Sequence, residues 1–307
     1  MCLHSVPRSP KIISPDLGGP ALAQVRGRNT TNDVMRGMCD KCKLPDILVA
    51  GKFDRRQVTV RHVRKGLVLR REQEEYVEQQ WQQLVANWAT SHSGSTLAPY
   101  PGKLFSLLDF RFSNLGLDLS VGEFSFDEYV VSMMPEFIER FGDIEVVPIT
   151  VGAVVTASDN RIVLGEGRPG TEEIETIAGF MEREDPDTHE ELSPHPFDQM
   201  ERELAEESGV DLKDIQTMTC LGLLGHGQPY VVFDVRLSIP CEVLACERTP
   251  RDREFRRLFS IRNDPDSLRS FVLDNKAAMT SHCLSNLLLW GKYAFEGDWY
   301  GSLLHQL

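Results

Sequence analysis

The segment FDQMERELAEESGV, residues 197–210, constrains the fold of this chain more than any other feature. It places four glutamates within seven residues, and Ser-Gly follows directly after the last of them. Leu204 is expected on the side opposite the acidic residues, where it can anchor the segment in a core, and Gly209 suits a left-handed C-cap. The pattern predicts a helix with one apolar face, beginning near Pro194 or Pro196, where proline is tolerated in a first turn.

Apolar strand patterns flank this helix on both sides. Residues 146–168 predict a strand, a tight turn at residues 159–160 and a second strand, and residues 215–240 predict two more. Residues 253–261 are expected to form a short strand or loop, and residues 274–295 a closing helix. Strands with one helix between them and another at the end are typical of an α/β sandwich.

The region before these elements has its own pattern. Residues 46–70 and 102–130 predict short strands, the second stretch ending in a helix start, and residues 135–145 predict a helix and linker. Residues 71–90 predict an amphipathic helix because apolar residues recur at helical spacing. We expect this apolar stripe to pack in a core; it consists of Val77, Trp81, Leu84 and Trp88.

We therefore expect four parts along the chain. Residues 1–45 are rich in Pro, Gly, Arg, Asn and Thr without apolar periodicity, which predicts a flexible extension. A smaller α+β N-terminal domain should follow over residues 46–145. The α/β sandwich domain should occupy residues 146–297, and residues 298–307 should form a C-terminal tail.

Composition excludes some classes of partner. The chain has 307 residues and a net charge of −13, with 46 acidic against 33 basic side chains. A nucleic-acid backbone needs a basic surface, so nucleic acid is not an expected partner. A small phosphorylated ligand still fits, provided that cations or a few arginines mediate. The sequence offers neither a membrane span nor a secretory signal, so we expect an intracellular, cytoplasmic protein.

The cysteines indicate reduced thiols. Seven cysteines at irregular spacing do not suggest a disulfide framework. Cys39 and Cys42 have C-x-x-C spacing, but a structural zinc site would need a second such pair. Four residues separate Cys241 from Cys246. For Cys39 and Cys42 we therefore favour two incidental thiols over a zinc site.

Three of the glutamates are candidates for metal binding. Glu203, Glu206 and Glu207 stand at i, i+3 and i+4, so a helix places them on one face. Exposed like charges at this spacing repel by about 0.2–0.5 kcal/mol per pair, and Arg202 alone is a weak counterweight. A bound Mg2+, or Mn2+, would turn the repulsion into coordination. The alternative is an ordinary solvated helix face, which we assign only to Glu201.

The full pattern favours the metal interpretation. RELAEESGV, residues 202–210, matches R-E-U-x-E-E-x-G-U with U aliphatic, which is the helical half of the Nudix box. The chain therefore resembles the Nudix hydrolase superfamily, and IAGFMERE, residues 177–184, resembles the loop half with Gly179 as its glycine. Between Gly179 and Arg202 lie 22 residues, where the family pattern has 13. The loop glutamate of the pattern accordingly falls on Asp185 or on Pro194.

An insertion within the box and a preceding α+β domain resemble a narrower group, the UDP-glucose and UDP-galactose pyrophosphatases. This resemblance implies a Nudix α/β/α sandwich that uses Mg2+, with Mn2+ as a possible substitute. It implies that Glu203 and Glu207 bind the metal, with Glu206 and the carbonyl of Ala178 completing one or two sites. Arg202 would orient Glu203.

Two residues outside the box are further candidates. Family members usually have another glutamate beyond the box, as a base or an extra ligand, and Glu254 in DREFRRLF best fits that place. Arg168 could clamp a phosphate of the substrate with two hydrogen bonds. For both residues a plain charged surface position is the competing interpretation. His226, in a glycine-rich turn, is interpreted as a turn residue.

The resemblance implies Mg2+-dependent hydrolysis of a nucleoside diphosphate linked to a second group. A UDP-sugar is the expected small-molecule substrate, and UMP plus sugar 1-phosphate the products. ADP-ribose or an ADP-sugar is an alternative, because IAGFMERE also resembles the loop of ADP-ribose hydrolases. A further alternative is a nucleotide-binding module that has lost turnover. The base, the sugar and the oligomeric state stay open.

Overall fold

A computed structural model provides the structure of the chain. It describes residues 46–63, 67–91, 102–144, 147–167, 173–183, 195–226, 228–246 and 255–307. The predicted flexible extension and its C-x-x-C pair lie outside these residues. Among the helices within them, none is long and apolar enough to cross a membrane.

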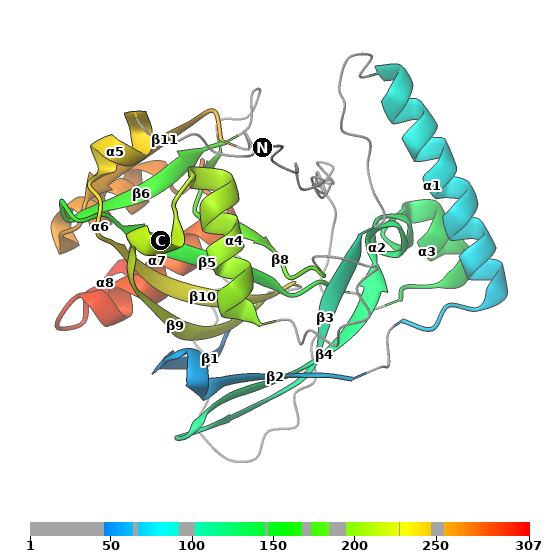
Figure 1. The fold of residues 1–307 in the computed structure, drawn as a ribbon, viewed down its shortest axis with the longest axis horizontal. Coiled ribbons are helices and arrows are strands. Elements are labelled where there is room, and N and C mark those ends of the chain that lie inside the picture. Colours follow the sequence, from blue (N-terminus) through cyan, green and yellow to red (C-terminus); the bar gives the residue numbers. More distant parts are fainter. Residues whose placement is uncertain are drawn as a thin grey trace, which may run out of the picture.

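Figure 1 shows the helices and strands of the described chain. The first half contains β1 (Asp46–Phe53), the 3-10 helix η1 (Arg55–Gln57), β2 (Val58–His62), α1 (Arg71–Ser91), β3 (Lys103–Ser113), β4 (Gly116–Ser125), α2 (Phe126–Ser132), α3 (Pro135–Phe141), β5 (Thr150–Thr156) and β6 (Arg161–Glu166). The second half contains β7 (Ile174–Glu175), β8 (Ile177–Phe180), α4 (Pro196–Ser208), η2 (Leu212–Asp214), β9 (Ile215–His226), β10 (Gln228–Leu237), α5 (Cys241–Cys246), β11 (Arg257–Arg262), α6 (Pro265–Asn275), α7 (Ser281–Ala294) and α8 (Trp299–Leu304).

The larger sheet has the strand order β1-β9-β10-β5-β6-β11, with β7 paired to β6 and β8 paired to β5. β10 runs parallel to β5, and the other pairs are antiparallel. Every residue of β5 is buried. A strand covered on both faces reads as an uninterrupted apolar run, and TVGAVVT has that character.

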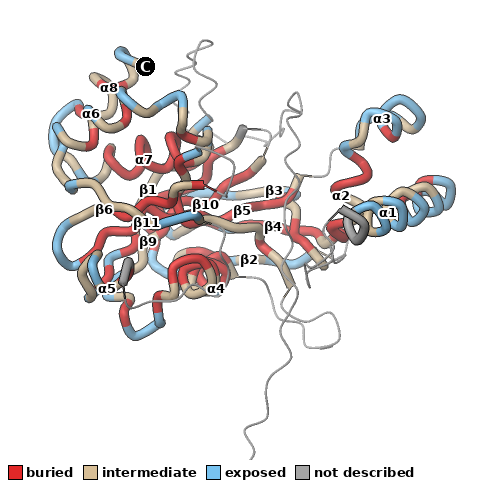
Figure 2. Tube along the Cα trace, turned by 90° about the horizontal axis from the view of Figure 1, so that it is seen from above, coloured by how far each residue is buried: buried red, intermediate tan, exposed pale blue. Residues whose placement is uncertain are grey.

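Alternate residues of β10 enter two different cores. Val231 and Phe233 belong to the core that contains the apolar face of α4, while Tyr230 and Val232 belong to the core that contains α7. Because successive side chains of a strand point to opposite faces, the two helices must cover opposite faces of the sheet. Figure 2 shows them on the two sides of the buried strands. The predicted mixed α/β class is confirmed.

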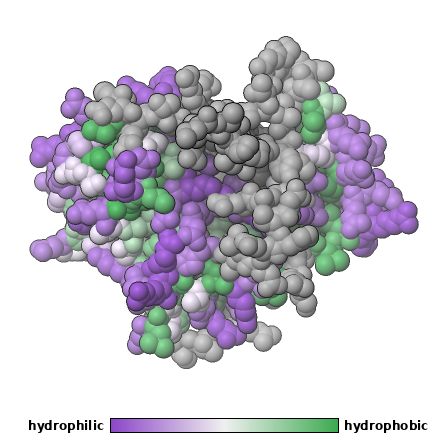
Figure 3. Space-filling view, viewed as in Figure 1, coloured by the Kyte–Doolittle hydropathy of each residue, from purple (hydrophilic) through white to green (hydrophobic). Residues whose placement is uncertain are grey.

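The smaller sheet has the order β2-β4-β3, and α1, α2 and α3 pack at its end (Figure 1). The predicted stripe of α1 does contribute to packing: Val77 is buried, and Trp81 meets Phe126 edge-to-face with ring centroids 6.0 Å apart. The side chain of Trp88 lies outside the described residues. Where α1 reaches the surface, Figure 3 shows mainly hydrophilic residues, as expected for an amphipathic helix.

The two sheets are joined along β3. Three backbone hydrogen bonds connect β3 to the chain around β5 and β8: Phe105 N to Met181 O (3.0 Å), Ile149 N to Phe105 O (2.8 Å) and Arg183 N to Lys103 O (2.9 Å). Side chains of β2, β3 and β4 also share the core that holds α4. β1, from the predicted N-terminal domain, pairs with β9 in the larger sheet. The division of the chain at residue 145 stays a prediction.

Several elements near the C-terminus differ from expectation. The closing helix begins at Ser281 instead of residue 274, because Thr280 Oγ1 caps it by accepting from Cys283 N at 3.2 Å. α5, α6 and α8 were not predicted. Residues 298–307, predicted as a tail, contain α8, whose Trp299 is buried and donates from Nε1 to Pro265 O at 2.9 Å. α5 and α8 have six residues each, too few for a helical period to stand out.

Leu204 should be the apolar anchor of α4, because its side chain is fully buried. Leu204→Ala is expected to lower the free energy of unfolding by about 2–5 kcal/mol, since it removes buried methyl groups and leaves a cavity. Urea denaturation followed by circular dichroism measures this. Leu212→Ala is the matched control, since Leu212 is 63% exposed and its truncation should change stability by about 0.5 kcal/mol or less. Equal losses for both variants would contradict the assignment.

Candidate functional site

α4 has well-defined ends. It starts at Pro196, one of the two predicted positions, and His195 caps it by accepting from Phe197 N through Nδ1 at 3.3 Å. The Nε2 of His195 lies 3.0 Å from Val58 O, which ties this cap to β2. Gly209 ends the helix in the left-handed conformation, with φ 70° and ψ 18°, so the predicted C-cap is confirmed. The two caps fix where α4 begins and ends, and therefore where the acidic side chains between them lie along the helix axis.

The first turn of α4 is held by Arg55 of η1. The Arg55 guanidinium forms ion pairs with Asp198 and Glu201 and lies 5.4 Å from the ring centroid of Phe197. Glu201, predicted to be solvated surface, thus has a partner from another element, and its side chain is 28% exposed. This contact was not predictable from α4 alone, because Arg55 lies 146 residues earlier in the chain.

Burial separates the three predicted metal ligands. Glu203 is 1% exposed and Glu207 is 2% exposed, whereas Glu206 is only partly buried. A carboxylate is costly to remove from water unless it accepts hydrogen bonds or meets a cation. Two such side chains one turn apart are therefore not an ordinary solvated helix face. Glu206 shares the helix but not this environment.

The two buried carboxylates lie against β8. A Cβ placed on Gly179 would come within 2.1 Å of Glu203 Oε1, so the glycine leaves the space that this carboxylate fills. The backbone N–H of Ala178 donates to Glu207 Oε2 at 3.1 Å. In an antiparallel strand the N–H and the carbonyl of one residue leave the same edge. The carbonyl of Ala178 therefore faces α4 as well.

Gln199 links this pair to the end of β8. Its side chain is 6% exposed, and its Oε1 accepts from Arg202 Nη2 at 2.6 Å and from the backbone N–H of Glu182 at 3.3 Å. Its Nε2 donates to Glu203 Oε1 at 2.6 Å. Arg202 also forms an ion pair with Glu182 at 3.3 Å. Gln199 and Glu182 were not predicted from the sequence, although Gln199 precedes Glu203 by four residues and so shares its helix face.

A buried polar group backs β8 from the α7 side of the sheet. The hydroxyl of Tyr230 lies over Gly152, the residue that pairs with Ala178, since a Cβ there would come within 1.9 Å of it. Burial raises the pKa of Tyr230, and the nearby Glu207 carboxylate raises it further, so Tyr230 stays a neutral phenol. Asn286 Nδ2 donates to this hydroxyl at 3.3 Å and to Thr176 Oγ1 at 2.8 Å.

The donor set suits a hard divalent cation. Mg2+ is usually bound by one or two carboxylates together with phosphate oxygens and water, and not by an all-protein cage. Glu203, Glu207 and the Ala178 carbonyl supply oxygen donors of that kind, and the space over Gly179 accommodates the first of them. Within the described ranges, no group of three or more His, Cys, Asp or Glu side chains could enclose a metal ion. The chemistry of the residues present fits the ion that the resemblance implies.

The structure brings together four of the predicted site residues: Ala178, Arg202, Glu203 and Glu207. Glu206 lies on the same helix with partial exposure. Arg168 and Glu254 lie outside the described residues, as do both positions counted for the loop glutamate, in residues 184–194. Their predicted roles stay predictions.

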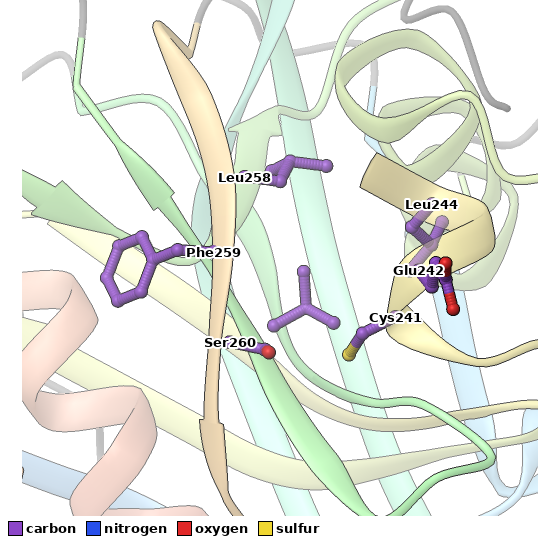
Figure 4. Close-up of a pocket in the computed structure, with 7 residues that line it drawn as sticks. Cys241, Glu242, Leu244, Leu258, Phe259 and Ser260 are labelled. Carbon is purple, nitrogen blue, oxygen red and sulfur yellow. The ribbon is translucent and has the colours of Figure 1, made fainter. Parts of the chain in front are cut away.

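A separate cavity of about 200 Å³ lies between α5, β6 and β11 (Figure 4). Its lining consists of Val163, Cys241, Glu242, Leu244, Leu258, Phe259 and Ser260. In Figure 4 the sulfur of Cys241 points toward Ser260 of β11, and burial raises the pKa of that thiol. The cavity includes none of the acidic residues of α4, so we do not assign it to the candidate site.

Comparisons with known proteins give only distant structural likeness. No protein-family model matches the chain, and no curated protein sequence matches it. A NUDIX hydrolase from Nitrosomonas europaea is 16% identical, with a TM-score of 0.34 over 50% of this chain and 94% of its own. The NUDIX domain of Shewanella oneidensis NrtR complexed with ADP ribose is 13% identical, with a TM-score of 0.35 over 56% of this chain and 100% of its own.

The fit of Glu203 over Gly179 can be tested by a double-mutant cycle. Gly179→Ala should lower the free energy of unfolding by about 1–3 kcal/mol, because the new methyl group meets the buried carboxylate. In a Glu203→Ala background the same change should cost less, with a coupling energy of about 0.5–3 kcal/mol. Calorimetric melting of the four proteins gives this energy. Strictly additive effects would show that the two residues do not touch.

Proposed function

We propose that this chain is a divalent-cation-dependent pyrophosphatase of the Nudix type, which hydrolyses the diphosphate of a nucleoside diphosphate linked to a second group. The proposal rests on one observation, the burial of Glu203 and Glu207 side by side against β8. The match of residues 202–210 to the helical half of the Nudix box supports the same assignment. Residues 146–297 would form the hydrolase domain.

In this proposal Glu203 and Glu207 hold Mg2+, or Mn2+, together with the Ala178 carbonyl, and Glu206 adds a ligand at the more exposed side. When bound, the cation offsets the charge of the diphosphate and activates the attacking water. Burial of the two carboxylates strengthens their attraction to a cation, because less water screens the charges. Tyr230 is not a candidate base, because its side chain is buried in the core on the α7 side of the sheet.

The reaction needs only water as a co-reactant. The oxygen of water forms a bond to one phosphorus, and the bond from that phosphorus to the bridging oxygen breaks. The bridging oxygen leaves with the other phosphate, and a proton of the water passes to the medium through a base. Glu254 is our candidate for that base, and Arg168 for a bidentate contact to the phosphate. No covalent enzyme intermediate is required.

The substrate that we propose is a UDP-sugar, cleaved to UMP and sugar 1-phosphate. Its support is the insertion between Gly179 and Arg202, where 22 residues replace 13, together with the strands and helix that precede the sandwich. ADP-ribose or an ADP-sugar is the second candidate, favoured by the loop sequence IAGFMERE at residues 177–184. A nucleotide-binding module without turnover is the third.

One assay separates these candidates. The purified chain is incubated with Mg2+ and UDP-glucose, ADP-ribose, ADP-glucose or NADH, and release of the nucleoside monophosphate is followed by chromatography. We expect UMP from UDP-glucose at the highest kcat/KM. Release from ADP-ribose alone would favour the second candidate, and binding without release the third. If no substrate in this panel is cleaved or bound, the proposed function is wrong.

Glu207→Gln should lower kcat/KM at least 100-fold (about 2.7 kcal/mol), because an amide of the same shape cannot neutralise a cation. The matched control is Asp198→Asn, a carboxylate on the same helix that faces Arg55 and is 61% exposed. It should keep kcat/KM within about threefold of the wild-type value. Full activity of Glu207→Gln would remove Glu207 from the proposed site.

A further inference from the structure

Gln199 forms three hydrogen bonds at the candidate site, although no sequence motif singled it out. Its carboxamide is bonded to Arg202, to the backbone N–H of Glu182 and to Glu203, and the side chain is 6% exposed. We propose that Gln199 is a positioning residue that fixes the carboxylate of Glu203 in the orientation needed for cation binding. This inference rests on the proposed function.

The orientation of the carboxamide follows from its neighbours. Arg202 Nη2 and the N–H of Glu182 can only donate, so both require the oxygen of Gln199. The nitrogen must then face Glu203, whose Oε1 accepts from it. The reversed amide would set donors against donors and an oxygen against a carboxylate. The two donors that bind the amide oxygen of Gln199 therefore turn its amide nitrogen toward Glu203.

The resulting bond restrains the carboxylate. The distance of 2.6 Å from Gln199 Nε2 to Glu203 Oε1 is that of a short hydrogen bond. Rotation of the carboxylate away from this position would break the bond. On its other side the carboxylate lies directly over Gly179. Glu203 is thus held by a donor and by the shape of β8.

The same network joins α4 to the chain that leaves β8. Glu182 contributes its backbone N–H to Gln199 and its carboxylate to Arg202. Arg202 in turn donates to Gln199, so one path from Arg202 to Glu203 runs through the carboxamide. The role of Arg202 expected from the resemblance, orienting Glu203, is then carried out by two side chains. Partners that orient a ligand in this way typically change metal affinity or activity 10- to 100-fold when removed.

The test measures Mn2+ binding without substrate, by isothermal titration calorimetry, on the full chain and its variants. Gln199→Met keeps the length of the side chain but removes the donor and the acceptor. We expect its Kd for Mn2+ to rise about 10- to 100-fold. The matched control is Gln73→Met, which removes a buried glutamine whose Oε1 caps α1 by accepting from Arg70 N. That variant should melt at a lower temperature with an unchanged Kd.

A second variant isolates the bond to Glu203. Gln199→Glu still accepts from Arg202 and from the N–H of Glu182 but cannot donate to Glu203. It should weaken Mn2+ binding as Gln199→Met does, and it carries the test if Gln199→Met melts below the assay temperature. An unchanged Kd in the folded variants, or tighter binding by Gln199→Glu, would overturn the inference while the proposed function stands. Wild-type protein that binds no Mn2+ would instead remove the proposed function itself.

Discussion

The structure depends on holding two carboxylates, Glu203 and Glu207, in a place that water barely reaches. Buried charge is unfavourable, so the fold must supply donors, close contacts and a rigid frame around it. Ala178 gives a backbone donor, Gln199 a carboxamide donor, and Gly179 the space. Each of these lies on β8 or α4, so the site depends on how those two elements are placed relative to each other.

The α4 helix both packs into the core and presents carboxylates to β8. Along α4, Phe197, Met200 and Leu204 enter the core shared with the smaller sheet, while Glu203 and Glu207 meet β8. β8 is paired to β5, and β5 is buried at every residue, so the strand edge facing α4 has little freedom to shift. Hydrogen bonds from β3 to Met181 and Ile149 extend this rigidity to the chain beyond β8.

The sequence predicted features that depend on neighbouring residues. The start of α4 at Pro196 and its end at Gly209 follow from the conformational limits of proline and glycine, and the strand pairs follow from alternating or continuous apolar runs. Features that depend on distant residues were missed, such as the contact of Arg55 with α4 and the pairing of β1 with β9. Gln199 was missed for the same reason, because its partner Glu182 lies across the inserted residues.

We propose that Glu203 and Glu207 form a cation site on β8. Anomalous diffraction from crystals grown with Mn2+ tests this site, since the metal is located without reference to turnover. We expect an anomalous peak in contact with the carboxylates of Glu203 and Glu207 and the carbonyl of Ala178. If crystals grown at a saturating Mn2+ concentration show no anomalous peak at α4, or show the peak only elsewhere, the proposed cation site is wrong.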